Sequence, residues 1–387
     1  MRYFNSILPT VILLLFLSAC KSLEPKVSPS TNEHIQATLD GLVTQNEIPG
    51  LNFSYIDAKN RQYNYSSGFE NKETQTELGP DHSLFSGSIG KTYAAAIIFQ
   101  LIDEGKINLD QNIRSYLPSI DWLERIPNIN DISVRMLLSH TSGLPRWVTK
   151  IEVWNMLQED PDKVWSYKDR LSLIFDDEPV HKAGEGWAYS DTNYILLGLL
   201  IETLLEKDYY SILEERILHP NGLTNTYPLV HRKIERLACG YSQLPPSFHI
   251  PNQVVNDEGS YVFNPQVEWT GGGLASTTSD LVKWCHIYYN GSVIKDQLKP
   301  DMILIHENGR NAYETIHSYG MGTFIYDTKY GTAYGHSGFM PGYNSIMAYF
   351  PDLNISCALQ TNCDYAGREM KLTEYLETCI KSIIRNE

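Results

Sequence analysis

Apolar residues spaced three and four positions apart predict a helix near each end of the chain. The first helix covers residues 32–46 and places Ile35, Leu39 and Leu42 on one face. The second covers residues 367–384, where apolar positions recur at the same spacing. Each helix therefore has an apolar face that must pack against the rest of the protein.

Strand-like segments also gather at the two ends of the chain, and they lie at 51–56, 62–67, 321–327, 343–351 and 354–362. Between them, from Ser88 to Trp284, helical signals dominate. We therefore expect an α/β (α+β) fold, in which both chain ends build one antiparallel sheet covered by helices. A mostly helical lobe of approximately residues 90–285 is inserted, and the cleft between the two parts is the expected place for a site.

The first residues resemble the signal peptide of a bacterial lipoprotein. Arg2 precedes an apolar run from Val11 to Leu17, which is too short to cross a bilayer as a stable helix. The run ends in Leu-Ser-Ala-Cys, which resembles a lipobox, so we expect cleavage after Ala19 and a lipid on Cys20. The alternative is plain cleavage at the same bond, which gives a soluble secreted protein.

This interpretation divides the chain into a signal peptide (1–19), a tether (20–33) and a single domain (34–387). The tether is polar and contains proline and serine, as flexible linkers do. We expect a protein held at the bacterial cell envelope by its lipid, facing the periplasm or the outer surface.

The composition is that of an ordinary globular protein, with 42% hydrophobic and 20% charged residues. The formal net charge of −15 argues against nucleic acid as a partner, because phosphate backbones bind clustered lysine and arginine. The cysteines after Cys20 are odd in number and lack metal-site spacing, so we expect buried apolar thiols. An exported protein also has the redox conditions for one disulfide. These cysteines are Cys239, Cys285, Cys357, Cys363 and Cys379.

A serine and a lysine three positions apart open an apolar, alanine-rich helix. Gly87 and Ser88 mark its start, and Gly105 marks its end. Positions three apart share a helical face, so Lys91 projects beside Ser88. A helix N-terminus suits a developing oxyanion and disfavours a charged lysine, which leaves the amine free to accept a proton. Rather than a surface helix with a polar start, the pattern indicates a nucleophile beside its base.

The spacing Ser-x-x-Lys is weak evidence alone, because it occurs three times here and chance would give about one or two matches. Ser18–Lys21 spans the end of the signal peptide. Ser292–Lys295 follows an Asn-Gly turn and opens no buried helix. Only Ser88–Lys91 has the expected context.

Two later segments add side chains suited to the same chemistry. Tyr189 stands just before a long amphipathic helix, where it could serve as a phenolate base or proton relay; a core tyrosine is the plainer alternative. His336-Ser337-Gly338 stands just before a strand, whose edge could offer a backbone N–H to an oxyanion. Alone, this triplet is better explained as a polar turn with a solvated histidine.

Together these segments resemble the serine hydrolases related to class C β-lactamases and D-Ala-D-Ala carboxypeptidases. The resemblance runs from about Ile35 to Ile384, with the segments in the order and spacing of the family. It includes LFSGSIGKTYAA, LIDEGKINLDQNIRSYLP, ISVRMLLSHTSGLP, AYSDTNYILLG, LACGYS, GGGLASTTSDLVKW and GHSGFMPGYNS.

The resemblance implies a β-lactamase/transpeptidase-like fold and a site that works without a cofactor or metal. Ser88 and Lys91 match the nucleophile and its proton acceptor, and Tyr189 matches the tyrosine of the Y-x-N motif. His336, which begins the H-x-G form of the K-T-G motif, is the fourth catalytic residue that the resemblance implies. The oxyanion hole is expected to be the backbone N–H groups of Ser88 and Phe339.

The residues expected to contact substrate are Asp191, Ser337 and Gly338. Two motif positions, those of Asp191 and His336, depart from the family. Asp191 replaces the asparagine of Y-x-N and cannot donate an amide hydrogen bond. It could pair with Lys91 and hold it charged, or bind a substrate amine. His336 replaces a lysine and removes a permanent cation that would hold a carboxylate.

The three motifs together favour hydrolysis of an ester or amide, with a small molecule or a short peptide such as a D-amino-acid peptide of the cell wall as the expected substrate. The two departures argue against efficient hydrolysis of β-lactams. The alternatives are a β-lactamase and a non-catalytic sensor that binds cell-wall peptide or penicillin. His140, in LLSHTSGLP, is expected to fix a turn by hydrogen bonds. Gly271, Gly272 and Gly273 are expected to allow close backbone packing near the site.

Overall fold

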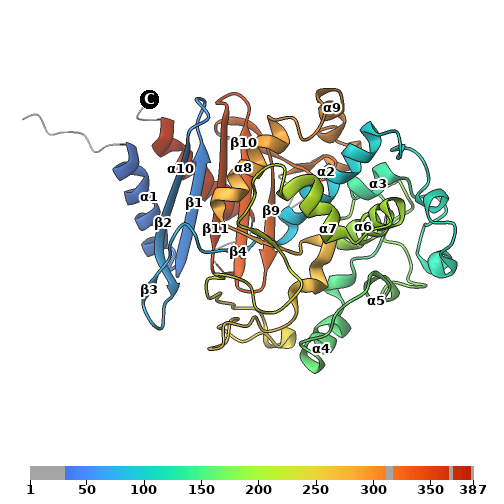
Figure 1. The fold of residues 1–387 in the computed structure, drawn as a ribbon, viewed down its shortest axis with the longest axis horizontal. Coiled ribbons are helices and arrows are strands. Elements are labelled where there is room, and N and C mark those ends of the chain that lie inside the picture. The colour runs from blue at the N-terminus through green and yellow to red at the C-terminus, as the bar shows by residue number, and fades with distance from the viewer. Residues whose placement is uncertain (1–30, 311–316, 366–368, 385–387) are drawn as a thin grey trace, which may run out of the picture.

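A large antiparallel sheet made from both ends of the chain forms the centre of the molecule (Figure 1). The computed structural model describes residues 31–310, 317–365 and 369–384. In spatial order the strands are β3 (Thr76–Glu77), β2 (Gln62–Asn71), β1 (Gly50–Ile56), β11 (Ile355–Thr361), β10 (Tyr343–Phe350), β9 (Gly331–Met340), β8 (Phe324–Thr328) and β7 (Ser318–Tyr319). The first and last parts of the chain meet where Leu51 of β1 pairs with Thr361 of β11.

Helices cover both faces of the central strands. Every residue of β1, β10 and β11 is buried, which requires a layer of structure on each side of the sheet. Helices α1 (Thr31–Gln45) and α10 (Glu369–Ile384) pack against each other, with α10 also contacting β11, and α8 (Thr278–Tyr289) lies against β1, β10 and β11.

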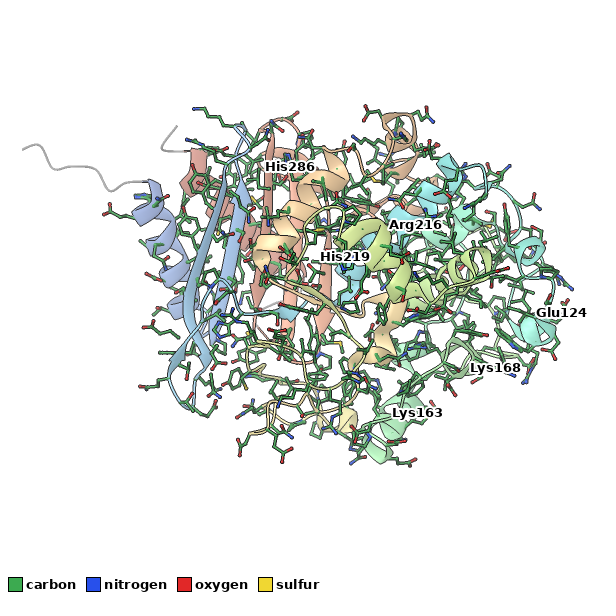
Figure 2. The ribbon with its side chains drawn as sticks, viewed as in Figure 1. Glu124, Lys163, Lys168, Arg216, His219 and His286 are labelled. Carbon is green, nitrogen blue, oxygen red and sulfur yellow. The ribbon has the colours of Figure 1, made fainter. Side chains whose placement is uncertain are left out.

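The middle of the chain forms a mainly helical part beside β9 (Figure 1). Its helices are α2 (Gly90–Asp103), α3 (Val134–Leu138), α4 (Ile151–Glu159), α5 (Tyr167–Ser172), α6 (Asp191–Leu205) and α7 (Tyr209–Leu213), followed later by α9 (Lys299–Met302). A small sheet of β4 (Leu84–Phe85), β6 (Leu274–Ser276) and β5 (Thr226–Pro228) ties this part to the large sheet. Charged side chains such as Glu124 and Lys168 lie exposed on its outside (Figure 2).

Helix α2 is buried almost to its end. Its side chains from Lys91 to Phe99 are inaccessible, and it packs against α6 and α7. Burying each large apolar side chain is worth roughly 1.5–3 kcal/mol, so the start of α2 is firmly held.

The structure bears out the predicted architecture and corrects three details. The predicted lobe of about 90–285 ends too late, because α8 packs on the large sheet. The tether boundary at 33 falls inside α1, which begins at Thr31. His336-Ser337-Gly338 lies within β9 and not before a strand. Residues 1–30, with the predicted signal peptide and Cys20, lie outside the described residues.

The five cysteines between Cys239 and Cys379 are free and buried, as expected for apolar core residues, and the structure holds no disulfide among them. In the described part of the chain, no cluster of three or more histidine, cysteine or acidic side chains could hold a metal ion. No helix in the same part is both long and apolar enough to span a membrane.

Candidate active site

Ser88 sits in a tight turn directly before α2. The turn is the 3-10 helix η1 (Gly87–Ile89), and Gly87 has a φ of +51°, which glycine adopts without strain. Gly272 packs on this turn so closely that a Cβ there would lie 2.8 Å from the Gly87 carbonyl oxygen. The prediction that the glycine run allows close backbone packing is thus confirmed, and Ser88 stays partly exposed.

Lys91 lies fully buried beneath Ser88. Its Nζ is 3.0 Å from Ser88 Oγ, 2.6 Å from Asp191 Oδ1 and 2.5 Å from the Gly271 carbonyl oxygen. An ammonium has three protons to donate, so these contacts use its full capacity. Burial lowers the pKa of Lys91 below its ordinary value, although the Asp191 carboxylate acts in the opposite direction.

Asp191, the first residue of α6, joins two cations. Arg146 Nε donates to Asp191 Oδ2 at 2.6 Å, and Lys91 occupies the other oxygen. Burial alone would raise the pKa of Asp191, but Arg146 and Lys91 outweigh it and hold that pKa below the ordinary value. Asp191 thus makes the expected pairing with Lys91, and each of its carboxylate oxygens accepts a hydrogen bond from a cation.

Tyr189 lies over the same cluster. Lys91 Nζ is 5.1 Å and Arg146 Cζ is 5.2 Å from the centre of its ring. The His140 ring packs against Tyr189 with centroids 4.3 Å apart. The structure therefore brings Ser88, Lys91 and Tyr189 together, as the sequence predicts.

His140 connects two loops behind Tyr189. Its Nδ1 accepts from the backbone N–H of Ser190 at 3.3 Å and from Asn193 Nδ2 at 2.8 Å. His140 thus forms hydrogen bonds as predicted, and these bonds hold its own turn against the start of α6. Burial keeps the pKa of His140 well below the ordinary value, so the ring is neutral.

His336 is a buried, neutral histidine on β9. A carbonyl oxygen only accepts, so the 2.6 Å contact between Nδ1 and the Ser337 oxygen places the proton on Nδ1. Nε2 then accepts from the Tyr319 hydroxyl at 3.0 Å. Burial, reinforced by Lys91, lowers the pKa of His336 to about 3, so no cation stands at the position of the family's lysine.

The end of β9 presents backbone groups to Ser88. Strand β8 pairs with β9 only as far as Gly335. Among the described residues, positions 336–340 of β9 therefore pair with a strand on one edge, which is β10. A Cβ on Gly87 would lie 2.6 Å from both the nitrogen and the oxygen of Phe339. Both groups of Phe339 therefore lie against the Ser88 turn, where the predicted second oxyanion donor is required.

Ser337 and Gly338 lie on the same stretch of β9. Ser337 is partly exposed, whereas Gly338 packs so tightly that a Cβ would lie 1.8 Å from the Ser86 oxygen. Of these two predicted substrate contacts, only Ser337 therefore has a side chain to offer.

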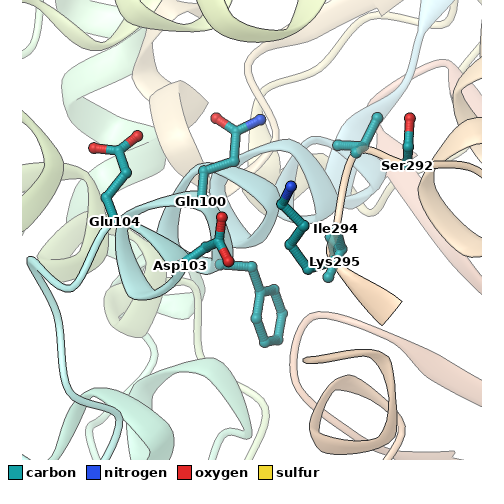
Figure 3. Close-up of a pocket in the computed structure, with 8 residues that line it drawn as sticks. Gln100, Asp103, Glu104, Ser292, Ile294 and Lys295 are labelled. Carbon is teal, nitrogen blue, oxygen red and sulfur yellow. The ribbon is translucent and has the colours of Figure 1, made fainter. Parts of the chain in front are cut away.

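The other complete Ser-x-x-Lys match in the described residues lies elsewhere. Ser292 and Lys295 line a cavity of about 230 Å³ with Gln100, Asp103 and Glu104, at the far end of α2 from Ser88 (Figure 3). Both residues are exposed. Of the two Ser-x-x-Lys pairs in the described residues, Ser88–Lys91 therefore lies in the site and Ser292–Lys295 lies outside it.

Arg146 and Glu268 belong to the site but do not stand out in the sequence. Arg146 follows the turn after His140, and Glu268 lies in η7 (Pro265–Gly271), three residues before the glycine whose oxygen contacts Lys91. Burial, and then the Asp191 charge, raise the pKa of Glu268 to about 7. Their only sequence signal is proximity to the SGLP and GGG segments.

Comparison with known proteins gives consistent matches. The family model described as Beta-lactamase matches residues 35–380. Penicillin-binding protein 4 of Amycolatopsis lactamdurans is 23% identical over 346 residues, covering 86% of each chain.

Two solved structures share the fold over most of their length. The D-amino acid amidase from Ochrobactrum anthropi SV3, complexed with L-phenylalanine, has a TM-score of 0.77 and 23% identity, over 92% of this chain and 99% of that one. A D-stereospecific amidohydrolase from Streptomyces sp. has a TM-score of 0.76 and 26% identity, over 89% and 98%.

Proposed function

The chain belongs to the Beta-lactamase family of serine hydrolases, and from that premise we propose that it cleaves an ester or amide bond through an acyl-enzyme on Ser88. One observation carries this proposal: Ser88 Oγ lies 3.0 Å from the amine of a buried lysine at the start of α2. A buried amine whose pKa is lowered is able to take the proton of the attacking hydroxyl.

The arrangement supports a two-step reaction. Ser88 Oγ attacks the substrate carbonyl while neutral Lys91, or a Tyr189 phenolate beside it, accepts the proton. The N–H groups of Ser88 and Phe339 stabilise the oxyanion, and the proton then passes to the leaving amine or alcohol. Water attacks the acyl-enzyme by the same route, releasing the acid and restoring Ser88.

The substrate class that we propose is an amide or ester of a D-amino acid. This rests on the similarity to the two solved structures, which are a D-amino acid amidase and a D-stereospecific amidohydrolase. It also rests on the neutral His336, because a β-lactam carboxylate would find no permanent cation there.

The first experiment compares hydrolysis of a p-nitrophenyl ester by residues 21–387 and by Ser88→Ala. We expect turnover by the unaltered protein and a loss of at least about a thousandfold in the variant. D- and L-amino acid amides and a penicillin, tested on the same pair, then identify the substrate class. If the unaltered protein gives neither turnover nor an acyl adduct on Ser88 by intact mass, the proposal is wrong and a binding protein is favoured.

A further inference from the structure

Glu268 borders the same small space as Asp191. A Cβ built on Gly271 would lie 3.8 Å from Glu268 Oε2 and 3.9 Å from Asp191 Oδ1. The oxygen of that glycine contacts Lys91, and Gly272 supports the Ser88 turn. The Glu268 carboxyl therefore stands beside the reacting groups.

The two carboxyl groups differ in their partners. Asp191 uses both oxygens, on Lys91 and on Arg146. By contrast, no hydrogen bond or ion pair with a described residue engages the Glu268 carboxyl, although its side chain is only partly exposed. A carboxylate held in this way has a high affinity for a cation that enters the site.

The charges around Ser88 favour a cationic substrate. When Lys91 acts as a base it is neutral, and the carboxyl groups of Asp191 and Glu268 then stand beside the guanidinium groups of Arg146 and Arg170. Arg146 donates to Asp191 and Arg170 donates to backbone carbonyl oxygens, whereas Glu268, with a pKa of about 7, is ionised above neutral pH. His336 is neutral, and the whole chain carries −15. An ammonium group is attracted to such a site, and a carboxylate is repelled.

We propose that Glu268 binds the ammonium group of the substrate and so selects amides or esters of amino acids with a free amine. Glu268 suits this role because Asp191 already binds Lys91 and Arg146. It rests on the proposed function, because it assumes that the substrate is held at Ser88.

The test compares two amides that differ by one ammonium group. D-Alanine amide and propanamide compete with turnover of p-nitrophenyl propanoate, a reporter without an amine. We expect D-alanine amide to inhibit at concentrations at least about tenfold lower than propanamide. Glu268→Gln abolishes this preference, and the comparison is made within the variant because loss of the Glu268 charge also lowers the pKa of Lys91 and so alters turnover of the reporter.

A matched control removes the same charge from the surface. Glu185 is 64% exposed and lies 3.9 Å from Lys182, so Glu185→Gln should keep the preference for D-alanine amide. Equal inhibition by the two amides in the unaltered protein overturns the proposal. So does a Glu268→Gln variant that keeps the preference but shifts the pH profile of the reporter, because Glu268 would then act only through Lys91.

Calorimetric titration of both amides into Ser88→Ala separates this proposal from the proposed function. Absence of reporter turnover would refute the acyl-enzyme on Ser88. The titration would still show whether D-alanine amide binds more tightly than propanamide, and whether the additional change Glu268→Gln removes the difference.

Discussion

The charge state of Lys91 depends on neighbouring residues with opposite effects. Asp191, and then Glu268, stabilise the ammonium form, and Arg146 opposes it. Burial is the largest influence, and it favours the neutral amine. The replacement of the family's asparagine by Asp191 is therefore compatible with a base at Lys91, because Arg146 neutralises much of the added charge.

Substituting Asp191 and substituting Arg146 should move the pH dependence of kcat/KM in opposite directions. Catalysis requires neutral Lys91, so activity rises as the pH passes the pKa of Lys91. Asp191→Asn removes a stabiliser of the ammonium and lowers that pKa, so the acid limb moves to lower pH. Arg146→Met raises the pKa of Lys91 and moves the limb to higher pH. At a fixed pH on this limb, moving the pKa by about 1 changes kcat/KM about tenfold.

The measurement is kcat/KM for a p-nitrophenyl ester across the pH range, with both variants beside the unaltered protein. Limbs that stay in place in both variants would contradict a base at Lys91. The base role would then pass to Tyr189.

Ser88, Lys91 and Tyr189 could be found in the sequence because short-range spacing and context mark them. Arg146 and Glu268 could not, since Arg146 lies in a loop and Glu268 in the short 3-10 helix η7, and neither segment has a periodic pattern. Arg146 reaches Asp191 across 45 positions of the chain and Glu268 lies beside it only in the folded protein. Such contacts depend on tertiary packing, which spacing along the chain does not report.

At the scale of elements, the position of Ser88 depends on backbone contact between η7 and the start of α2. Gly272→Ala would place a methyl group 2.8 Å from the Gly87 carbonyl and 3.2 Å from the Ser88 nitrogen. Backbone cannot move aside as a flexible side chain would. We expect a loss of about 1–3 kcal/mol in unfolding free energy and a fall in kcat/KM of about tenfold or more.

Thermal or denaturant unfolding and ester hydrolysis, measured on the same sample, test this expectation. Gly41→Ala in α1 is the control, since the nearest atom to a Cβ there is 3.8 Å away, and it should be neutral or stabilise by up to about 1 kcal/mol. Unchanged stability and activity in Gly272→Ala would show that this contact does not position Ser88.

Helices α2, α6 and α10 were predictable from their apolar spacing, whereas β9 was not. Its sequence, GTAYGHSGFM, contains three glycines and few β-branched residues. The packing explains two of them: a Cβ on Gly335 would lie 2.0 Å from the Met347 oxygen, and Gly338 is as crowded by Ser86. The glycines that conceal the strand in the sequence are those that let it approach its neighbours.

At the scale of the whole molecule, strand signals at both ends with helices between them predicted one sheet closed by distant segments. The order of the strands could not be predicted, because an alternating pattern shows that a strand has a buried face but does not identify its neighbours. For the same reason α8 was assigned to the wrong part. Its apolar face shows that it is packed, and only the fold shows that it packs on β1 and β11.

The attachment of the whole molecule is the last prediction, and it depends on Cys20. The apolar run from Val11 to Leu17 ends just before this cysteine, as in lipoprotein precursors. We expect the full chain, expressed in a bacterium, to enter the membrane fraction, with a lipid on Cys20 in the mass spectrum of its N-terminal peptide. Cys20→Ser should release the protein and leave kcat/KM for the ester unchanged, because the site is built from residues 86–339. An unmodified Cys20 on a soluble, processed protein would instead establish plain secretion.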